Sequence, residues 1–176
     1  MRIAPVLVAL LGAVPAMAAG PRDWAGTWKG ECRLTPAYQG VSSFPASLTV
    51  ALTDKADVLR WTLIYETSPR DVRNYELIAV DAAAGRYTVD EKNGLFLDAA
   101  YSDGVLYVPF TIGELLITAT YAVGDDGVMH LNLPSFSSTP SRTTCLSGQP
   151  DTCVQSFALS SSQHCWLRRQ EMRKLE

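Results

Sequence analysis

The chain has 176 residues and a formal net charge of −3, with 15 Lys and Arg residues against 18 Asp and Glu residues. This length suits one domain that buries a hydrophobic core of its own. Because nucleic-acid binding depends on a basic surface that displaces counterions, the charge balance argues against a nucleic-acid partner.

Residues 1–19 have the three-part pattern of a secretory signal peptide. Arg2 supplies a positive charge, an apolar core follows, and Ala16 and Ala18 are the small residues of a cleavage site. A membrane anchor is the alternative, but this core is too short for a bilayer of roughly 30 Å and prolines flank it. The sequence therefore predicts a cleaved signal peptide, a single periplasmic or secreted domain over 20–176, and no transmembrane segment.

The rest of the chain consists of short β-prone runs separated by turn residues. Apolar and polar residues alternate within several runs, and no segment has the 3.6-residue spacing of a long amphipathic helix. A segment rich in Ser, Thr and Pro, from Ser135 to Gln149, is predicted to be a long loop at one end of the fold. The predicted strands cover residues 23–32, 48–53, 58–66, 74–80, 86–90, 95–101, 105–112, 115–123, 128–133, 154–159 and 163–169.

Glycine-containing dipeptides between neighbouring runs indicate how the strands connect. They end at Gly85, Gly94, Gly104 and Gly127, and three of them are Asn-Gly or Asp-Gly, which are favoured where a hairpin needs positive φ. Successive hairpins predict an antiparallel meander. The predicted fold class is therefore all-β, an up-and-down β-barrel, with a β-sandwich as the alternative. A closed barrel is favoured because it leaves no exposed strand edge.

The four cysteines, Cys32, Cys145, Cys153 and Cys165, are interpreted as two disulfides, because disulfides persist in exported proteins. A glycine and a proline between Cys145 and Cys153 suit a tight loop closed on itself, which leaves Cys32 to pair with Cys165. The second bond would join the first strand to the last and contribute roughly 3 to 5 kcal/mol in a chain-entropy model. Zinc is the alternative, but the chain has no Cys-x-x-Cys motif and no metal site is predicted.

The first predicted strand resembles that of the calycin superfamily, which includes the lipocalins. Calycins carry Gly-x-Trp just after the signal peptide, and Gly26, Thr27 and Trp28 match it here. They also tend to carry an arginine at the end of the last strand that packs over this tryptophan. The resemblance therefore implies that Arg168 or Arg169 helps to close the barrel floor, and Arg168 is taken as the match.

The chain also departs from typical lipocalins. It has no match to their Thr-Asp-Tyr type of loop motif, and it has more than eight predicted strands. A remote calycin-like barrel is therefore favoured over a typical lipocalin. In the alternative interpretation, Trp24 and Trp28 are ordinary core aromatics of an unrelated β-domain.

Motifs that carry enzymatic chemistry are missing from the sequence. There is no Gly-x-Ser-x-Gly, no His-Glu-x-x-His and no phosphate-binding glycine loop, and His130 and His164 have no recognisable catalytic setting. Asp90 and Glu91 adjoin a turn, where solvated charges are common, so they are not taken as a glycosidase pair. The sequence favours a binding protein over an enzyme, and it predicts no catalytic residue and no cofactor.

Haem is the one cofactor alternative. Nitrobindin-like haem barrels resemble this chain in an early Gly-x-Trp-x-Gly, at Gly26, Trp28 and Gly30, and in a late-strand histidine that ligates iron, matched by His164. Side chains alternate along a strand, so His164 and Cys165 face opposite sides. An inward-facing disulfide at Cys165 is therefore in tension with an internal haem ligand at His164.

The leading functional hypothesis is an exported barrel that binds a small, largely apolar ligand in its interior, as such cavities usually do. The candidate wall residues are Trp61, Leu63, Tyr65, Tyr107, Phe110, Ile117 and Tyr121. The alternative is that these side chains fill a solid core.

The second hypothesis is a non-catalytic interaction module or inhibitor that binds an envelope protein partner through loops at one barrel end. It is motivated by the segment from Ser135 to Gln149 and its predicted local disulfide, because a constrained loop loses less entropy on association.

Overall fold

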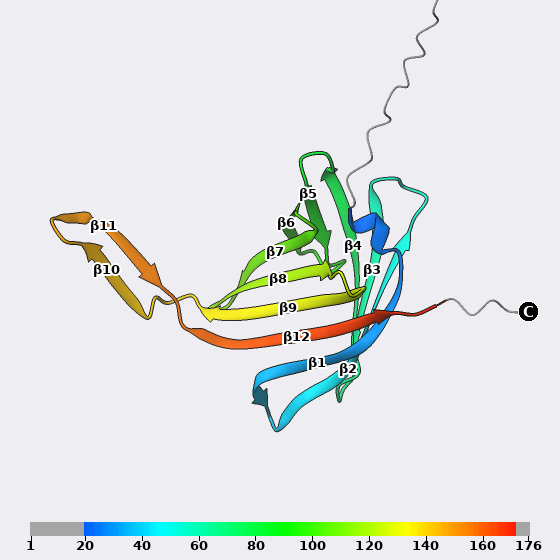
Figure 1. Cartoon of the computed structure of the whole chain (residues 1–176), viewed down its shortest axis with the longest axis horizontal. Helices are drawn as coiled ribbons and strands as arrows, with labels where there is room; N and C mark the ends of the chain where they lie inside the picture. Colours follow the sequence, from blue (N-terminus) through cyan, green and yellow to red (C-terminus); the bar gives the residue numbers. More distant parts are fainter. Residues whose placement is uncertain (1–19, 172–176) are drawn as a thin grey trace, which may run out of the picture.

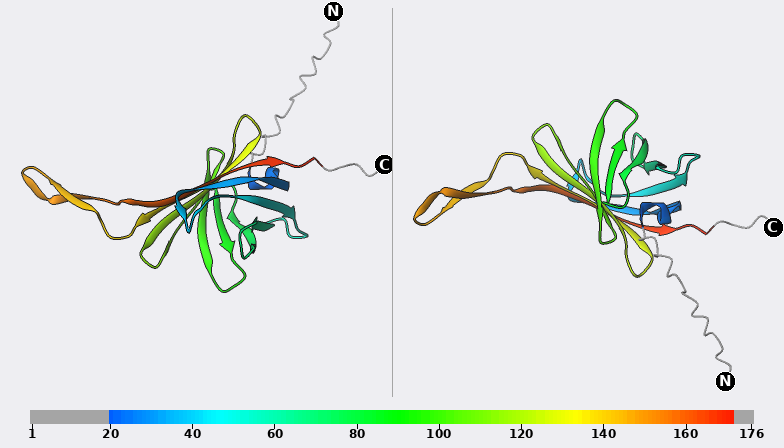
Figure 2. Two further views of the ribbon diagram at one scale, coloured as in Figure 1. Left: turned by 90° about the horizontal axis from the view of Figure 1, so that it is seen from below. Right: turned by 90° about the horizontal axis from the view of Figure 1, so that it is seen from above.

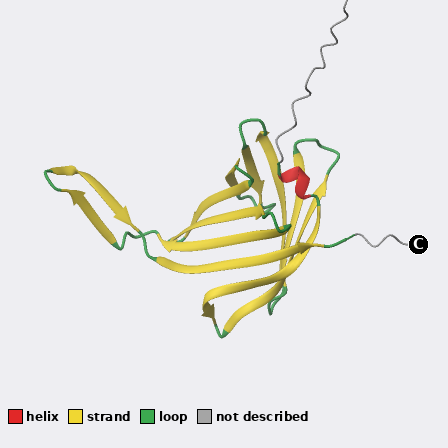
Figure 3. Ribbon diagram, viewed as in Figure 1, coloured by secondary structure: helices red, strands yellow, loops and turns green. Residues whose placement is uncertain are grey.

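The computed structural model describes residues 20–171, which are almost entirely β-strand apart from a short 3-10 helix, η1 (Pro21–Trp24) (Figure 3). The barrel strands are β1 (Gly26–Tyr38), β2 (Val41–Leu52), β3 (Val58–Tyr65), β4 (Asp71–Asp81), β5 (Arg86–Asp90), β6 (Phe96–Ser102), β7 (Val105–Ile112), β8 (Leu115–Val123), β9 (Val128–Ser137) and β12 (Leu159–Arg169). A separate hairpin is formed by β10 (Arg142–Leu146) and β11 (Gln149–Ser156). The predicted signal peptide lies outside the described residues.

The ten barrel strands form a closed antiparallel sheet in the order β1-β12-β9-β8-β7-β6-β5-β4-β3-β2 (Figure 1). Every neighbour in this order is also a neighbour in sequence, except where β9 pairs with β12 across the inserted hairpin and where β1 pairs with β12 to close the sheet. Glycines with positive φ occupy the turns at Gly85, Gly94, Gly104 and Gly127. The prediction of an all-β, up-and-down barrel is therefore confirmed.

Alternate side chains of each strand form the core inside the barrel. On β3, Trp61, Leu63 and Tyr65 are each at most 4% exposed. Leu48 and Val50 on β2 lie directly opposite Leu63 and Trp61, so the two strands contribute to the same buried face. Full burial of one such aliphatic side chain contributes roughly 1.5 to 3 kcal/mol, and the period of two in the sequence follows from this burial.

One end of the barrel is closed by Trp24, Trp28 and Arg169. The Trp28 indole N–H donates to the Trp24 carbonyl at 2.9 Å, and the Arg169 guanidinium lies 5.3 Å from the Trp28 ring centroid. Arg169 also donates to the Ala25 carbonyl. Gly26 suits this position for two reasons. Its φ of +142° is one that other residues rarely adopt, and a Cβ there would lie 3.0 Å from the Arg169 Nε.

The choice of Arg168 as the closing arginine is wrong. Arg168 pairs with Lys29 on β1, whereas Arg169 pairs with Trp28. Successive side chains of a strand face opposite sides of the sheet, so only Arg169 shares the face of Trp28. Arg168 is exposed on the outer wall.

The first strand begins at Gly26 and not at Asp23. Pro21 sits at the start of η1, and the Asp23 carboxylate accepts a hydrogen bond from the Gly20 N–H at 2.9 Å. Both features favour a helical turn over extended backbone. This turn places Trp24 across the barrel end, where its ring centroid lies 6.2 Å from that of Trp61.

The two predicted disulfide pairings are both present. Cys32 on β1 is bonded to Cys165, its direct partner on β12, and both are fully buried. Cys145 on β10 is bonded to Cys153, its direct partner on β11. Within residues 20–171, no helix is long and apolar enough to cross a membrane.

The segment from Ser135 to Gln149 is not a long loop. Its first residues extend β9, and its later residues form β10 and the turn to Gln149, where β11 begins; the β10–β11 hairpin, residues 142–156, is called the arm below. The arm projects away from the barrel beyond the ends of β9 and β12 (Figures 1 and 2). All of its strand residues are exposed, so its sequence has no buried face from which a strand pair could be predicted. The predicted strand over 154–159 is divided between the end of β11 and the first residue of β12.

Candidate functional site

The barrel contains a cavity, partly open to solvent beside Arg73, of about 50 Å³, measured as the space open to the centre of a water-sized sphere. One water needs roughly 10 to 15 Å³ by this measure, so the cavity has room for a few waters or for an organic group of a few heavy atoms. Most of the lining is apolar and comes from Leu63, Leu77, Val89, Leu97, Leu106, Val108, Phe110, Ala119 and Leu133. The interior is therefore not packed completely shut.

Five of the predicted wall residues line this cavity, namely Trp61, Leu63, Tyr65, Phe110 and Tyr121. The Trp61 and Tyr121 rings meet edge to face, with centroids 5.0 Å apart. Their contact is buried deep in the barrel, because both side chains are less than a tenth exposed.

The other two predicted wall residues lie elsewhere. Tyr107 is 40% exposed and pairs with Thr120 on the outer face of β7 and β8, so its prediction as an interior residue is wrong. Tyr107 and Phe110 are three positions apart on one strand, and such positions face opposite sides. Ile117 pairs with Phe110 near the strand ends and lines a second hollow, not the cavity.

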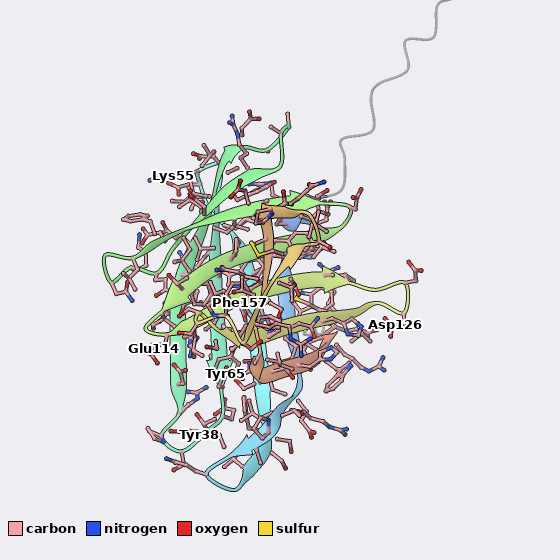
Figure 4. All side chains as sticks on the ribbon, turned by 90° about the vertical axis from the view of Figure 1, so that its left-hand side faces the viewer. Tyr38, Lys55, Tyr65, Glu114, Asp126 and Phe157 are labelled. Carbon is pink, nitrogen blue, oxygen red and sulfur yellow. A yellow bond between two sulfur atoms is a disulfide. The ribbon has the colours of Figure 1, made fainter. Side chains whose placement is uncertain are left out.

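That second hollow is a groove of about 660 Å³ where the arm joins the barrel. It is lined by the ends of β7, β8 and β9 and by residues 155–157 at the base of the arm. Phe110 lines both the groove and the cavity, so the two spaces adjoin at this side chain. Figure 4 looks from the arm side, with Phe157 and Tyr65 within the outline of the barrel and Glu114 and Asp126 on outlying turns.

A polar cluster lies on the cavity wall at β4, where sequence reasoning did not look. Arg73 and Tyr75 alternate with Leu77 and face the cavity with it. Arg73 is paired with Leu63 and Tyr75 with Trp61. The predicted strand covered residues 74–80 and so excluded Arg73. Arg73 alternates with Tyr75 and Leu77, and this spacing was the sequence signal that could have placed it on the inner face.

Arg73 forms an ion pair with Asp71. The Arg73 Nη2 and the Asp71 Oδ2 are 2.8 Å apart, and the Nε donates to the same oxygen at 2.9 Å. Both side chains are about 40% exposed. Partial burial alone would lower the pKa of Arg73, but the Asp71 carboxylate and the neighbouring tyrosines outweigh it and raise this pKa, so the guanidinium stays charged.

The Tyr65 hydroxyl is buried without a hydrogen-bond partner in residues 20–171. Its ring lies under the Arg73 guanidinium, with 5.1 Å between the Arg73 Cζ and the ring centroid. The Gln163 amide is close enough to influence the hydroxyl, but it does not bond it with acceptable geometry. A buried hydroxyl without a partner costs roughly 1 to 3 kcal/mol, so this position favours an added hydrogen-bonding group.

The tyrosines of the cavity keep their protons near neutral pH. Burial raises the pKa of Tyr65, Tyr75 and Tyr121 above the ordinary phenol value of 10.0, and in each case it is the largest cause. Each phenol is therefore a neutral group that can donate one hydrogen bond. Glu91 completes the polar lining, and it accepts a hydrogen bond from the Asn93 side chain at 3.1 Å.

The two histidines meet on the outer wall of the barrel. The His130 Nδ1 and the His164 Nε2 are 3.1 Å apart, and the His164 ring stacks on Trp166 with centroids 4.0 Å apart. An internal haem ligated by His164 is therefore excluded, because Cys165 and not His164 occupies the inner face. Within residues 20–171, no group of three or more His, Cys, Asp or Glu side chains is placed to hold a metal ion.

A scan against protein-family models found no match to this chain, and a search of curated proteins found none either.

Proposed function

We propose that this chain is an exported, calycin-like barrel that binds a small, largely apolar molecule in its interior cavity. The single observation that carries the proposal is an interior cavity with apolar walls and a few polar groups at one side, the usual composition of small-molecule sites. Trp61, Leu63, Tyr65, Phe110 and Tyr121 are the proposed wall residues. Calycin membership is supported by the barrel and by Arg169 over Trp28.

The size of the cavity limits the ligand. A space of about 50 Å³ for sphere centres suits a group of a few heavy atoms, because an engineered cavity that binds benzene has roughly 150 Å³. A larger ligand would have to displace Phe110 and extend into the groove beyond it, because Phe110 lines both spaces.

Filling the cavity tests this proposal. Ala119 lines the cavity and is 5% exposed, so Ala119→Leu would occupy part of it. Ala122 lies on the other face of the same strand, and Ala122→Leu is the matched control. Native mass spectrometry of protein from an oxidising compartment is expected to detect a bound molecule in the wild type and in Ala122→Leu, but not in Ala119→Leu.

An apolar probe extends the same test. Toluene titrated against tryptophan fluorescence should bind the wild type and Ala122→Leu and lose most of its affinity for Ala119→Leu. Ala119→Val is the milder variant if Ala119→Leu overpacks the core, which typically costs 1 to 3 kcal/mol. Equal toluene binding by all four proteins would contradict a ligand site inside the barrel.

The second candidate function is a protein-binding module that acts through the arm. It is favoured by the exposure of both arm strands, with apolar side chains such as Leu146 and Val154 more than half exposed. Replacing Cys145 and Cys153 by Ser should weaken binding of such a partner while leaving toluene binding unchanged. If the same change empties the cavity and spares the partner, this candidate fails.

A further inference from the structure

We infer that the ligand of the interior cavity is an electrically neutral molecule that carries a hydrogen-bonding oxygen, such as the carbonyl of a small amide or ketone. This inference rests on the proposed function and defines the ligand class by its charge. It follows from three groups in and beside the cavity wall: the ion pair of Arg73 with Asp71, the carboxylate of Glu91, and the unpaired hydroxyl of Tyr65.

The one cation of the cavity lining is already matched. The Arg73 guanidinium uses its Nε and its Nη2 on the Asp71 carboxylate, at 2.9 and 2.8 Å. An anionic ligand would have to share the arginine with this carboxylate. Two like charges beside one cation repel each other, and the repulsion grows as water is excluded from the site.

Glu91 adds a second carboxylate to the same wall. Arg73, Asp71 and Glu91 together carry one net negative charge, so the site has no unmatched positive charge for a carboxylate ligand. A cationic ligand would approach Glu91 favourably but would also meet the Arg73 guanidinium and lose its hydration among apolar side chains. Burying an ion without a dedicated partner is costly, so a neutral ligand is favoured over both ions.

The polar recognition of a neutral ligand comes from the tyrosines. Tyr65 is 4% exposed and its hydroxyl has no partner in the described part of the chain. A carbonyl oxygen that displaces the side chains covering this hydroxyl would give it the acceptor that it lacks. The neighbouring tyrosines of the lining, Tyr75 and Tyr121, are neutral as well and would not repel an uncharged oxygen.

Three benzene derivatives of similar size test the charge preference: benzamide, benzoate and benzylamine, with toluene as the apolar reference. Each would be titrated near neutral pH into the full mature chain and followed by tryptophan fluorescence, because Trp61 lines the cavity. We expect benzamide to bind about tenfold or more tightly than benzoate and benzylamine. Equal or tighter binding of benzoate would overturn the inference.

Asp71→Asn should change the preference in a predictable direction. Without the Asp71 charge, Arg73 becomes available to an anion, so benzoate should gain about fivefold or more while benzamide changes less than about twofold. Asp98→Asn is the matched control, because Asp98 lies exposed on the outer face of β6 and its loss removes the same charge. A gain of benzoate binding in both variants, or in neither, would contradict the role given to Asp71.

Tyr65→Phe tests the hydrogen bond itself. We expect it to weaken benzamide about three- to tenfold, the range for one neutral hydrogen bond, and to leave toluene unchanged. A loss of benzamide and toluene together would instead indicate a rearranged cavity, and unchanged benzamide binding would reject Tyr65 as the recognising group. If toluene binds while benzamide has no advantage, this inference fails and the proposed function stands. If no probe binds and native mass spectrometry also detects no bound molecule, the proposed function is rejected.

Discussion

The barrel and the arm are both antiparallel β-structure and each has one disulfide, but they are stabilised in different ways. Barrel strands bury alternate side chains, and the Cys32–Cys165 bond lies inside that core. The arm strands bury nothing, and the Cys145–Cys153 bond crosses a pair of exposed strands. The comparison shows that antiparallel strands can be held together by a buried core in one region and by a local disulfide in another.

The largest expected difference comes from removing a large buried side chain. Trp28 is 3% exposed, and Trp28→Ala should lower the free energy of unfolding by about 3 to 5 kcal/mol. Val154 on the arm is 66% exposed, and Val154→Ala should change it by less than about 0.5 kcal/mol. Urea denaturation followed by far-UV circular dichroism measures both. Similar decreases in the free energy of unfolding for the two variants would mean that the arm and the barrel core unfold as one cooperative unit.

Removing each disulfide in turn sharpens the comparison. The Cys32–Cys165 bond spans 133 residues, and replacing both cysteines by Ala should destabilise the barrel by about 2 to 5 kcal/mol. The Cys145–Cys153 bond spans 8 residues, and replacing both by Ser should leave the urea midpoint of the barrel unchanged. The arm variant should instead be cut faster by a nonspecific protease within residues 142–156, as mass spectrometry of the fragments would reveal.

Arg169 and Arg168 provide a comparison within one strand. Arg169 stacks on Trp28 and bonds the Ala25 carbonyl, so Arg169→Met should cost about 1 to 2 kcal/mol. Arg168→Met, on the outer wall, should cost less than about 0.5 kcal/mol. Thermal unfolding monitored by tryptophan fluorescence distinguishes them, and a reversed order would contradict the closure of the barrel end by Arg169.

The smallest expected effect is a pH dependence of the barrel that the arm lacks. Burial, and then the neighbouring His130, lowers the pKa of His164 from its ordinary value of 6.5. The unfolded chain therefore binds more protons, and barrel stability should fall as pH decreases through the unfolded value. Urea midpoints at about pH 7.5 and about pH 5.5 should differ in the wild type and differ less in His164→Gln, whereas equal differences would contradict this assignment. The arm, residues 142–156, has no histidine.

The fold could be predicted because it depends on features that one sequence displays. Turn glycines such as Gly94 and alternating residues such as Trp61 and Leu63 are visible without coordinates. The pairing of Cys32 with Cys165 followed from the short spacing of the other two cysteines.

The candidate site was only partly predictable. Aromatic residues on alternating positions identified Trp61, Tyr65 and Tyr121 as wall residues, but Arg73 was missed because charged residues are normally expected on the solvent face. Tyr107 was assigned to the interior by its chemistry although its position in β7 places it outside. Of the arm, only residues 154–156 fell within a predicted strand, 154–159, because a strand pair without a buried face has no hydrophobic period to detect.

The seam between β1 and β12 has a consequence for the order of biosynthesis. These two strands lie at opposite ends of the chain, so the sheet cannot close before the last strand has been made. The arm cysteines are close in sequence and can pair earlier, because short loops close with a smaller entropy cost. Refolding from the reduced state should therefore accumulate a one-disulfide species with the arm bond, which thiol trapping and mass spectrometry would identify.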